Sequence, residues 1–188
     1  MRDLIEAITA EYLRYKALGE AALQQVDERY LSAAGPGNGN SLAIIVWHLS
    51  GNLASRFTDF LTDDGEKPWR QREEEFKRRD VSRPALMEKW DSGWSVLLTT
   101  LADLTDSDLG RVITIRRQPL TVREALLRSL AHASYHVGQI VYLGKALCGD
   151  RWRYLSIAPG ASDAYNANPT GESASAHASQ LSGRSGHA

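Results

Sequence analysis

The chain is poor in the features that mark secreted, membrane-embedded or disulfide-stabilised proteins. It contains one cysteine, Cys148, so no disulfide can form within it and nothing indicates an oxidising compartment. No apolar run approaches the ~20 residues that span a bilayer, and its first residues carry charges where a signal peptide would be apolar. We therefore expect a cytoplasmic protein without a membrane partner, and a packed rather than a nucleophilic Cys148.

Positive charge is not in excess either. The chain has 22 Lys and Arg against 23 Asp and Glu, which gives a formal net charge of -1. A surface that follows nucleic-acid phosphates usually needs a clear basic excess. The basic run 77–79 follows the acidic run 73–75 after a single residue, so the two electrostatic fields partly cancel and a solvated helix face is expected there. These observations predict no nucleic-acid partner.

Helical periodicity dominates what is present. Hydrophobic residues make up 43% of the 188 residues, enough for the core of one domain. Apolar residues recur at three- and four-residue steps, the helical period, in four segments: 3–31, 42–61, 82–101 and 121–147. Four long amphipathic segments of this kind predict a helical bundle.

The segments between these helices predict how the bundle is connected. Ser41 or the preceding Asn40, Ser82 and Thr121 are expected N-caps, and Thr121 forms a capping box with Glu124. The second connection has about 20 residues where ~2–8 is usual, so it can carry the chain past the adjacent neighbour. The β-branched run 112–115, bounded by a turn, resembles a hairpin. The predicted fold class is all-α: an antiparallel four-helix bundle with a long crossover connection and a small β-hairpin before the last helix.

The composition changes near the C-terminus. After Ala158 the chain is rich in Gly, Ser, Ala, Asn and Pro, and the last residues hold almost no apolar anchor beyond Leu181. We therefore expect three parts: the bundle over residues 1–158, a C-terminal extension over 159–170 and a disordered tail over 171–188. His177 and His187 lie in that tail and are expected to have no role.

Two histidines on the fourth helical segment carry the strongest functional signal. His132 and His136 are four residues apart, so they lie on one helix face with Cβ atoms about 5–6 Å apart. Residues at steps of three and four place this pair on the apolar stripe that should face the core. Burial of two imidazole rings without hydrogen-bond partners destabilises the fold by roughly several kcal/mol, and a shared metal ion removes that penalty.

A third histidine also lies among apolar residues that should face the core, this time on the second helical segment. His48 lies within an apolar stretch and shares a face with Asn52. A single helical histidine is more often a core residue bonded to a carbonyl group, so the prediction of a metal site depends on His48, His132 and His136 together. A zincin helix needs Glu after its first His, and a di-iron bundle needs Glu three residues before a ligand His. Neither pattern is present.

What remains is a mononuclear site with three nitrogen ligands. Three neutral imidazoles favour transition metals over Mg or Ca, and three protein ligands leave coordination positions open, which is typical of catalytic sites. We expect one divalent transition metal ion, zinc or nickel first, with iron or manganese as alternatives. Asn52, Arg56 and Arg128 are weaker candidates for contacts to a ligand or substrate, Arg56 and Arg128 through bidentate hydrogen bonds to an anion.

Several motifs together resemble the DinB/YfiT-like superfamily of metal-binding four-helix bundles, in a branch of uncharacterised function. The resemblance covers roughly residues 1–168. The matching stretches are His48–Asn52, Arg56–Phe60, Asp64–Trp69, Thr114–Arg116, His132–Tyr142, Leu155–Ile157 and Tyr165–Asn166.

The resemblance implies a function class without a substrate. In that superfamily one histidine on the second helix and an H-x-x-x-H pair on the fourth bind a divalent ion, and these ligands correspond to His48, His132 and His136. Homodimers are frequent, and activities include thiol transfer with low-molecular-weight thiols and proposed hydrolysis. We therefore expect a metal-dependent enzyme that activates a thiol or water on a small-molecule substrate, and a homodimer. The alternatives are a non-catalytic metal-containing binding or stress-response protein, and a structural bundle.

Asp59 and Glu124 are the carboxylates considered as a base for hydrolysis, although Glu124 already has a capping role. Thiol transfer needs no separate protein base, because a metal ion deprotonates a coordinated thiol. The sequence therefore favours thiol transfer slightly.

Overall fold

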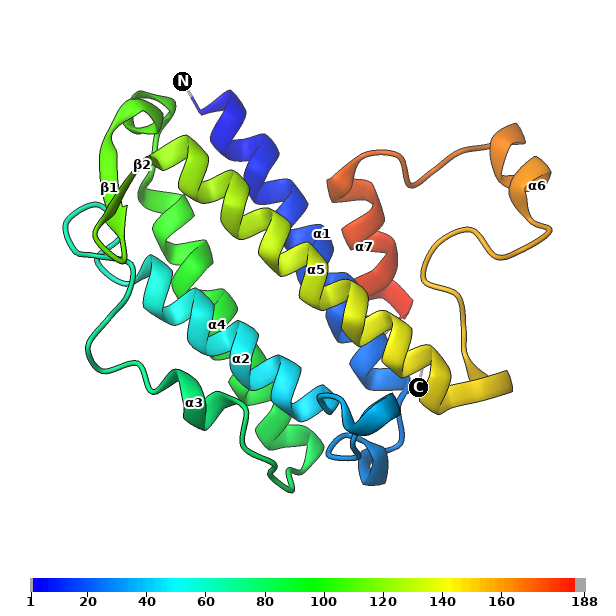
Figure 1. Ribbon diagram of the computed structural model, residues 1–188. Helices are drawn as coiled ribbons and strands as arrows, with labels where there is room; N and C mark the ends of the chain where they lie inside the picture. The colour runs from blue at the N-terminus through cyan, green and yellow to red at the C-terminus, as the bar shows by residue number, and fades with distance from the viewer. Residues whose placement is uncertain (1, 185–188) are drawn as a thin grey trace.

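A bundle of four long helices forms the body of the protein in a computed structural model that describes residues 2–184 (Figure 1). The long helices are α1 (Asp3–Gln25), α2 (Leu42–Phe57), α4 (Arg83–Asp103) and α5 (Val122–Cys148). The shorter elements are α3 (Arg72–Glu75), β1 (Val112–Ile115), β2 (Gln118–Thr121), α6 (Ser162–Ala167), α7 (Ala174–Arg184) and 3-10 helices at Glu28–Tyr30, Pro36–Asn38, Asp106–Gly110 and Gly149–Arg151. The predicted helical class and the hairpin before the last long helix are confirmed.

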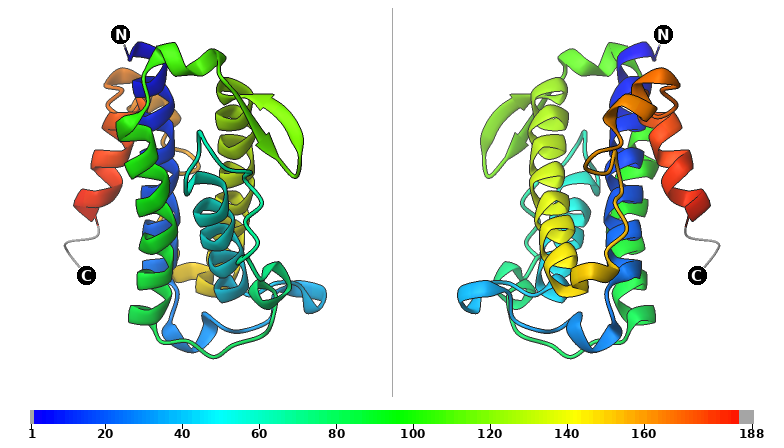
Figure 2. Two further views of the ribbon diagram at one scale, coloured as in Figure 1. Left: turned by 90° about the vertical axis from the view of Figure 1, so that its left-hand side faces the viewer. Right: turned by 90° about the vertical axis from the view of Figure 1, so that its right-hand side faces the viewer.

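Two neighbouring helices of the bundle, α2 and α4, run in the same direction. Ser50 Oγ donates to the Lys89 carbonyl near their middles, and Thr100 Oγ1 donates to the Phe57 carbonyl towards their C-terminal ends. A parallel pair needs a connection that returns along the helix, about 24 Å for 16 residues. Residues 58–82, which we call the connector, cover that distance along the outside of the bundle (Figure 2).

The predicted caps determine where three of the long helices begin. Ser41 Oγ accepts from the Ile44 N–H and Ser82 Oγ from the Ala85 N–H, and Thr121 and Glu124 form the expected capping box. The first helix ends earlier than its periodicity predicts, at Gln25. The reason is Asp27, whose side chain caps the following 3-10 helix.

Aromatic side chains fill the centre of the core. Trp90 and Trp94 are fully buried, and Tyr12 packs edge-on against Trp94 and Phe57. Burial of each such side chain stabilises the fold by about 1.5–3 kcal/mol. The α2 and α4 backbones approach closely at Gly93, where a Cβ would lie 2.6 Å from Ser50 Cα. The bundle is therefore tightly packed where these two helices cross.

The connector is fastened to the tip of the hairpin mainly by the Asp64 carboxylate, and Glu66 of the connector also binds the Arg116 side chain. Arg116 and Arg117 form the two-residue turn between β1 and β2, both with left-handed backbone (φ 55° and 63°). Asp64 accepts hydrogen bonds from the N–H groups of both arginines, at 2.8 and 2.7 Å, and of Glu66, at 2.7 Å. Partial burial raises the pKa of Asp64, but these hydrogen bonds outweigh it and hold the pKa well below its ordinary value.

The C-terminal segment corrects one expectation. The composition predicts disorder over residues 171–188, but residues 174–184 form α7, which packs along α1 (Figure 1). Leu181 is 1% exposed and belongs to the core, and His177 Nε2 lies 2.9 Å from the Leu155 carbonyl. The expectation fails because composition says little about a short helix that one buried leucine anchors. His187 lies outside the described residues.

None of the helices within residues 2–184 combines the length and the apolar character needed to cross a bilayer.

Candidate metal centre

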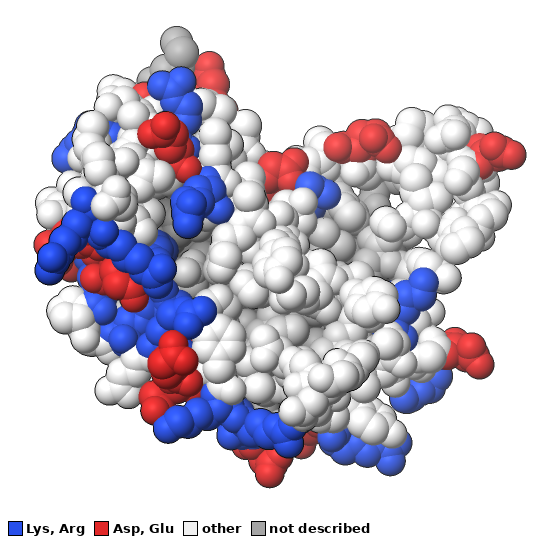
Figure 3. Space-filling view, in the orientation of Figure 1, with Lys and Arg blue, Asp and Glu red and all other residues white. Residues whose placement is uncertain are grey.

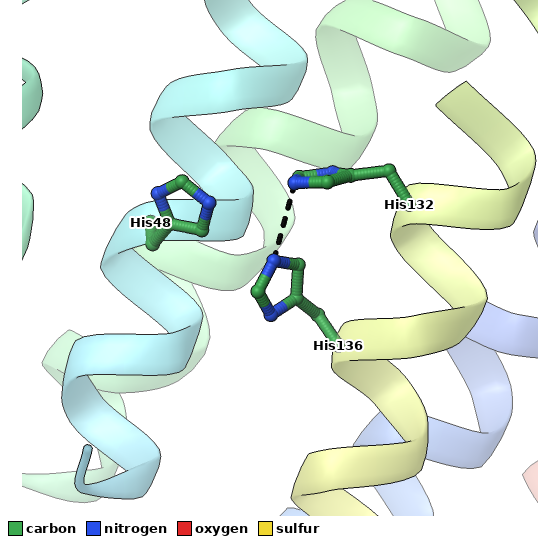
Figure 4. Close-up of side chains that lie close together, drawn as sticks. All are labelled: His48, His132 and His136. Atoms are coloured by element: carbon green, nitrogen blue, oxygen red, sulfur yellow. Dashed lines mark hydrogen bonds between the residues drawn. The ribbon is translucent and has the colours of Figure 1, made fainter. Parts of the chain in front are cut away.

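Three histidines from two helices meet at one point in the bundle. His48 comes from α2, and His132 and His136 come from successive turns of α5 (Figure 4). One ring nitrogen from each lies within 4.8 Å of the other two, and the Nε2 atoms of His132 and His136 are 3.1 Å apart. The three predicted ligands are therefore brought together by the packing of α2 against α5, and this buried cluster could hold a metal ion.

A buried carboxylate orients the His48 ring. The Nδ1 atom of His48 lies 3.0 Å from Oε2 of Glu75, which belongs to α3 in the connector. Arg70 binds the same carboxylate with two hydrogen bonds, Nε to Oε1 at 2.8 Å and Nη2 to Oε2 at 2.9 Å. Burial raises the pKa of Glu75, but the hydrogen bonds and charges of His48 and Arg70 together outweigh that effect. The net pKa is lowered, so the carboxyl group is ionised at pH 7. The ionised carboxylate favours the tautomer with a proton on His48 Nδ1, which leaves Nε2 as a lone-pair donor.

Gly51 makes room for this arrangement. It lies nearly one turn after His48 on α2, and a Cβ built there would collide with the Glu75 carboxylate. The Phe76 ring also packs against His48, with a distance of 4.7 Å between the two ring centroids. The His48 ring is therefore held by the Glu75 carboxylate, for which Gly51 leaves room, and by its contact with the Phe76 ring.

His136 is oriented locally, by its own helix. Its Nδ1 atom lies 2.9 Å from Oε1 of Gln139, three residues further along α5. Because an amide oxygen can only accept, this contact places the proton on Nδ1 and again leaves Nε2 with a lone pair. Two of the three rings thus present an unprotonated nitrogen to the centre.

His132 differs from the other two because its outer nitrogen, Nδ1, is buried without a hydrogen-bond partner among the described residues. Burial, followed by the nearby His136 and His48, lowers the pKa of His132 to about 3. Burial also lowers the pKa of His136. Both rings are therefore neutral at pH 7, the form in which imidazole binds metals.

The donor set fits a transition metal. A tetrahedral ion with bonds of 2.0–2.1 Å holds its ligand nitrogens about 3.3 Å apart, close to the 3.1 Å between His132 and His136. A ligand histidine usually donates its second ring N–H to a carboxylate or carbonyl group. Glu75 and Gln139 supply that contact for His48 and His136.

A pocket of about 250 Å³ opens beside the cluster, and His48 and His132 lie in its wall. Asn52 and Arg128, both predicted as substrate contacts, line it as well, and neither side chain has a hydrogen bond or ion pair within residues 2–184. Arg56 also lines the pocket, but it binds the Glu66 carboxylate at 3.0 Å and the Gly65 carbonyl. The structure thus places all three candidates at the pocket and leaves two of them available to a ligand.

Sequence reasoning missed Glu75. The charge pattern predicts that the acidic run 73–75 is part of a solvated face, and Glu73 and Glu74 are indeed exposed. Glu75 is only 7% exposed, because the connector folds back and places it against His48. The contact joins residues 27 positions apart in a segment with little periodicity, so no local pattern indicates it.

The remaining candidates do not contribute to the pocket. Cys148 is buried, its Sγ lies 3.3 Å from the Gln25 carbonyl, and burial raises its pKa, which agrees with a packing role. Asp59 is not among the residues lining the pocket, and Glu124 serves as the helix cap.

Comparison with known proteins gives a family without a described activity. The chain matches, over residues 1–161, the family described as "Protein of unknown function (DUF1572)". No curated protein and no solved structure matches it. The matched span contains all three histidines, Glu75 and the residues that line the pocket. The chain therefore belongs to the DUF1572 family.

Proposed function

We propose that the protein is a metal-dependent enzyme that binds one divalent transition metal ion, zinc or nickel first, through His48, His132 and His136. The observation that supports the proposal is the convergence of three imidazoles beside a pocket. Iron and manganese are the alternatives. The proposal also places the protein in the DinB/YfiT-like superfamily and in the cytoplasm.

The open pocket is the argument for catalysis. Three protein ligands leave coordination positions free, whereas structural zinc sites are usually closed by four. When bound, zinc lowers the pKa of a coordinated water to about 7 and deprotonates a coordinated thiol. The chain's own contribution is to hold His48 through Glu75 and His136 through Gln139, and to admit a small molecule next to them.

Thiol transfer is the reaction that we favour. In the part of the chain that the structure describes, no carboxylate lines the pocket, and Glu75 is already bound to His48 and Arg70. Hydrolysis usually uses a general base within hydrogen-bond reach of the attacking water. A thiol that loses its proton to solvent needs none, so a low-molecular-weight thiol is the proposed substrate. The second candidate is a non-catalytic metal-containing binding or stress-response protein.

Under the same proposal the chain forms a homodimer. The outer side of α5 is largely free of charged side chains (Figure 3), and Leu127, Tyr135 and Tyr142 on this helix are 51, 62 and 75% exposed. Exposed apolar side chains grouped on one face are typical of interaction surfaces. Light scattering during size-exclusion chromatography measures the mass directly, and 20.8 kDa rather than twice that value would contradict the dimer.

Elemental analysis and a thiol-transfer assay test the enzyme proposal. Protein purified without chelators should hold about one transition metal ion per chain, and absence of any such metal would refute the proposal. Metal-loaded protein is then incubated with monobromobimane and several small thiols. The thiol sulfur forms a bond to the bromine-bearing carbon of monobromobimane. Bromide leaves with the electron pair of the broken bond, and the thiol proton passes to solvent. A rate no higher than that of the triple variant His48→Ala, His132→Ala, His136→Ala would favour the binding protein.

A further inference from the structure

The charges around the pocket indicate which kind of small molecule it admits. We infer that the pocket beside the histidine cluster binds a ligand carrying an oxyanion group, and that Arg72, Arg128 and Asn52 form the subsite for that group. This inference rests on the proposed function, because it concerns the substrate of the same site.

The charged side chains that line the pocket, within the described residues, are all positive. Among residues 2–184, five arginines line it and no aspartate or glutamate does: Arg56, Arg70, Arg72, Arg116 and Arg128. In Figure 3 the basic side chains gather on the side of the molecule that carries the connector and the hairpin. A cleft lined by one sign of charge concentrates ligands of the opposite sign, and a bound divalent cation would add to this field.

Three of the five arginines already have buried or half-buried carboxylate partners. Arg56 and Arg116 both bind Glu66, each at 3.0 Å. Arg70 binds Glu75 through two hydrogen bonds, and its own side chain is 2% exposed. These three shape the pocket, but their hydrogen-bonding groups are engaged and their charge is partly compensated.

Arg72 and Arg128 remain for a ligand. Arg128 projects from α5, one turn before His132, and has no ion pair within residues 2–184. The ion pair of Arg72 is with the neighbouring Glu73, and that side chain is 85% exposed. A pair so open to solvent contributes about 0–1 kcal/mol and does not compete strongly with a ligand.

The position of Arg72 connects this charge to the metal ligands. Its guanidinium carbon lies 4.8 Å from the centroid of the Phe76 ring, and that ring in turn packs against His48. Stacking restricts the arginine side chain without using its N–H donors. Asn52, one turn after His48 on α2, adds an amide without a partner among the described residues. Donors from α2, α3 and α5 therefore line one small space.

The size of the pocket limits the ligand. Ligand pockets are typically about 300–1,000 Å³, and this one is about 250 Å³. A short molecule can place one end at the histidines and an oxyanion at the arginines. Guanidinium groups bind planar carboxylates and tetrahedral oxyanions alike, so the shared chemistry is a small anion.

Four thiols of similar length test the inference, because they differ mainly in the group at the far end. The probes are 3-mercaptopropionate, 2-mercaptoethanesulfonate, 2-mercaptoethanol and 2-aminoethanethiol, titrated into cobalt-loaded protein while its visible absorption is recorded. We expect an anionic thiol to bind about tenfold more tightly than 2-mercaptoethanol, the effect of one charge-assisted hydrogen bond, and the cationic thiol to bind most weakly. Tighter binding of 3-mercaptopropionate than of 2-mercaptoethanesulfonate would indicate a subsite for a planar carboxylate, and the reverse order would indicate a subsite for a tetrahedral oxyanion.

Substitution then assigns the effect to residues. In Arg128→Gln and Arg72→Gln the advantage of the anionic thiol should fall several-fold, while cobalt binding and the affinity for 2-mercaptoethanol stay unchanged. Arg123→Gln, at an exposed position of α5 outside the pocket, is the matched control for net charge. Equal affinities for all four thiols, or an anion preference that survives both substitutions, would overturn the inference. If no cobalt binds, the proposed function itself fails, and the two failures are thereby distinguishable.

Discussion

The two halves of the histidine cluster are built in different ways. On the α5 side, His132 and His136 lie one turn apart, and the second ring is oriented by Gln139 on the same helix. On the α2 side, His48 is oriented by Glu75, a residue 27 positions away on the connector. One half follows from helix geometry, whereas the other depends on a long-range contact. The α5 half should therefore tolerate changes in the connector, and the α2 half should not.

Removal of an α5 ligand should have the largest effect. His132→Ala leaves two imidazoles, so we expect the metal content to fall from about one ion per chain to near zero, measured by elemental analysis. His177→Ala is the matched control, because His177 contacts the Leu155 carbonyl outside the cluster. Equal metal content in His132→Ala and wild type would show that the α5 half does not bind the ion.

Removal of the charge behind His48 should have the next largest effect. Glu75→Gln keeps the size of the side chain but removes the carboxylate that orients the ring, and loss of such a partner typically weakens metal binding about 10–100-fold. Competition with a chromophoric chelator measures the affinity. Glu74→Gln is the control, because Glu74 is exposed and pairs with Lys77. An unchanged affinity in Glu75→Gln would remove the distinction between the two halves.

A methyl group at Gly51 should disturb the contact between Glu75 and His48 by displacing the Glu75 carboxylate. In Gly51→Ala the new Cβ collides with the Glu75 carboxylate, so we expect metal binding to weaken by about tenfold, near the lower limit for a displaced partner. Gly138→Ala on α5 is the counterpart in the other half. A Cβ at Gly138 would meet no other segment within 4 Å, so this substitution should leave affinity intact and stabilise the helix by about 0.5–1 kcal/mol. Calorimetric melting and chelator competition distinguish the two, and similar behaviour of both variants would contradict the prediction.

The attachment of the connector to the hairpin should have a smaller effect, on stability. Asp64→Asn removes charge-assisted hydrogen bonds to the turn, and we expect the free energy of unfolding at pH 7 to fall by about 1–2 kcal/mol. Because the folded pKa of Asp64 lies below its unfolded value, its contribution is present above about pH 4 and is lost as the pH falls further. Denaturant titrations at pH 7 and pH 3 should therefore show a difference between variant and wild type that shrinks at the lower pH. A constant difference would mean that the ionised carboxylate is not responsible.

What depends on local geometry could be predicted from the sequence. Helical periodicity and the caps at Ser41, Ser82 and Thr121 indicate the helix starts, and the four-residue spacing places His132 and His136 on one face. The inward position of His48 is also predictable from its apolar surroundings. Each of these inferences uses contacts within a few residues.

The parts that were missed depend on how distant segments return to the bundle. Glu75 reaches His48 only because the connector folds across α2, and α7 forms only because Leu181 finds a place on the core next to α1. Charge and composition make both segments look solvated. In each case tertiary packing decides the outcome, and a single sequence carries little information about such contacts.

The hairpin tip forms part of the pocket wall, through Ile115 and Arg116, yet contributes none of the three histidines. Its turn is fastened to the connector chiefly by one carboxylate. Substitutions in that turn would change the shape of the pocket wall without replacing any of the three histidines. The candidate ligands thus lie on the packed helices and part of the pocket wall on a surface turn, so the wall can vary in sequence while the cluster stays the same.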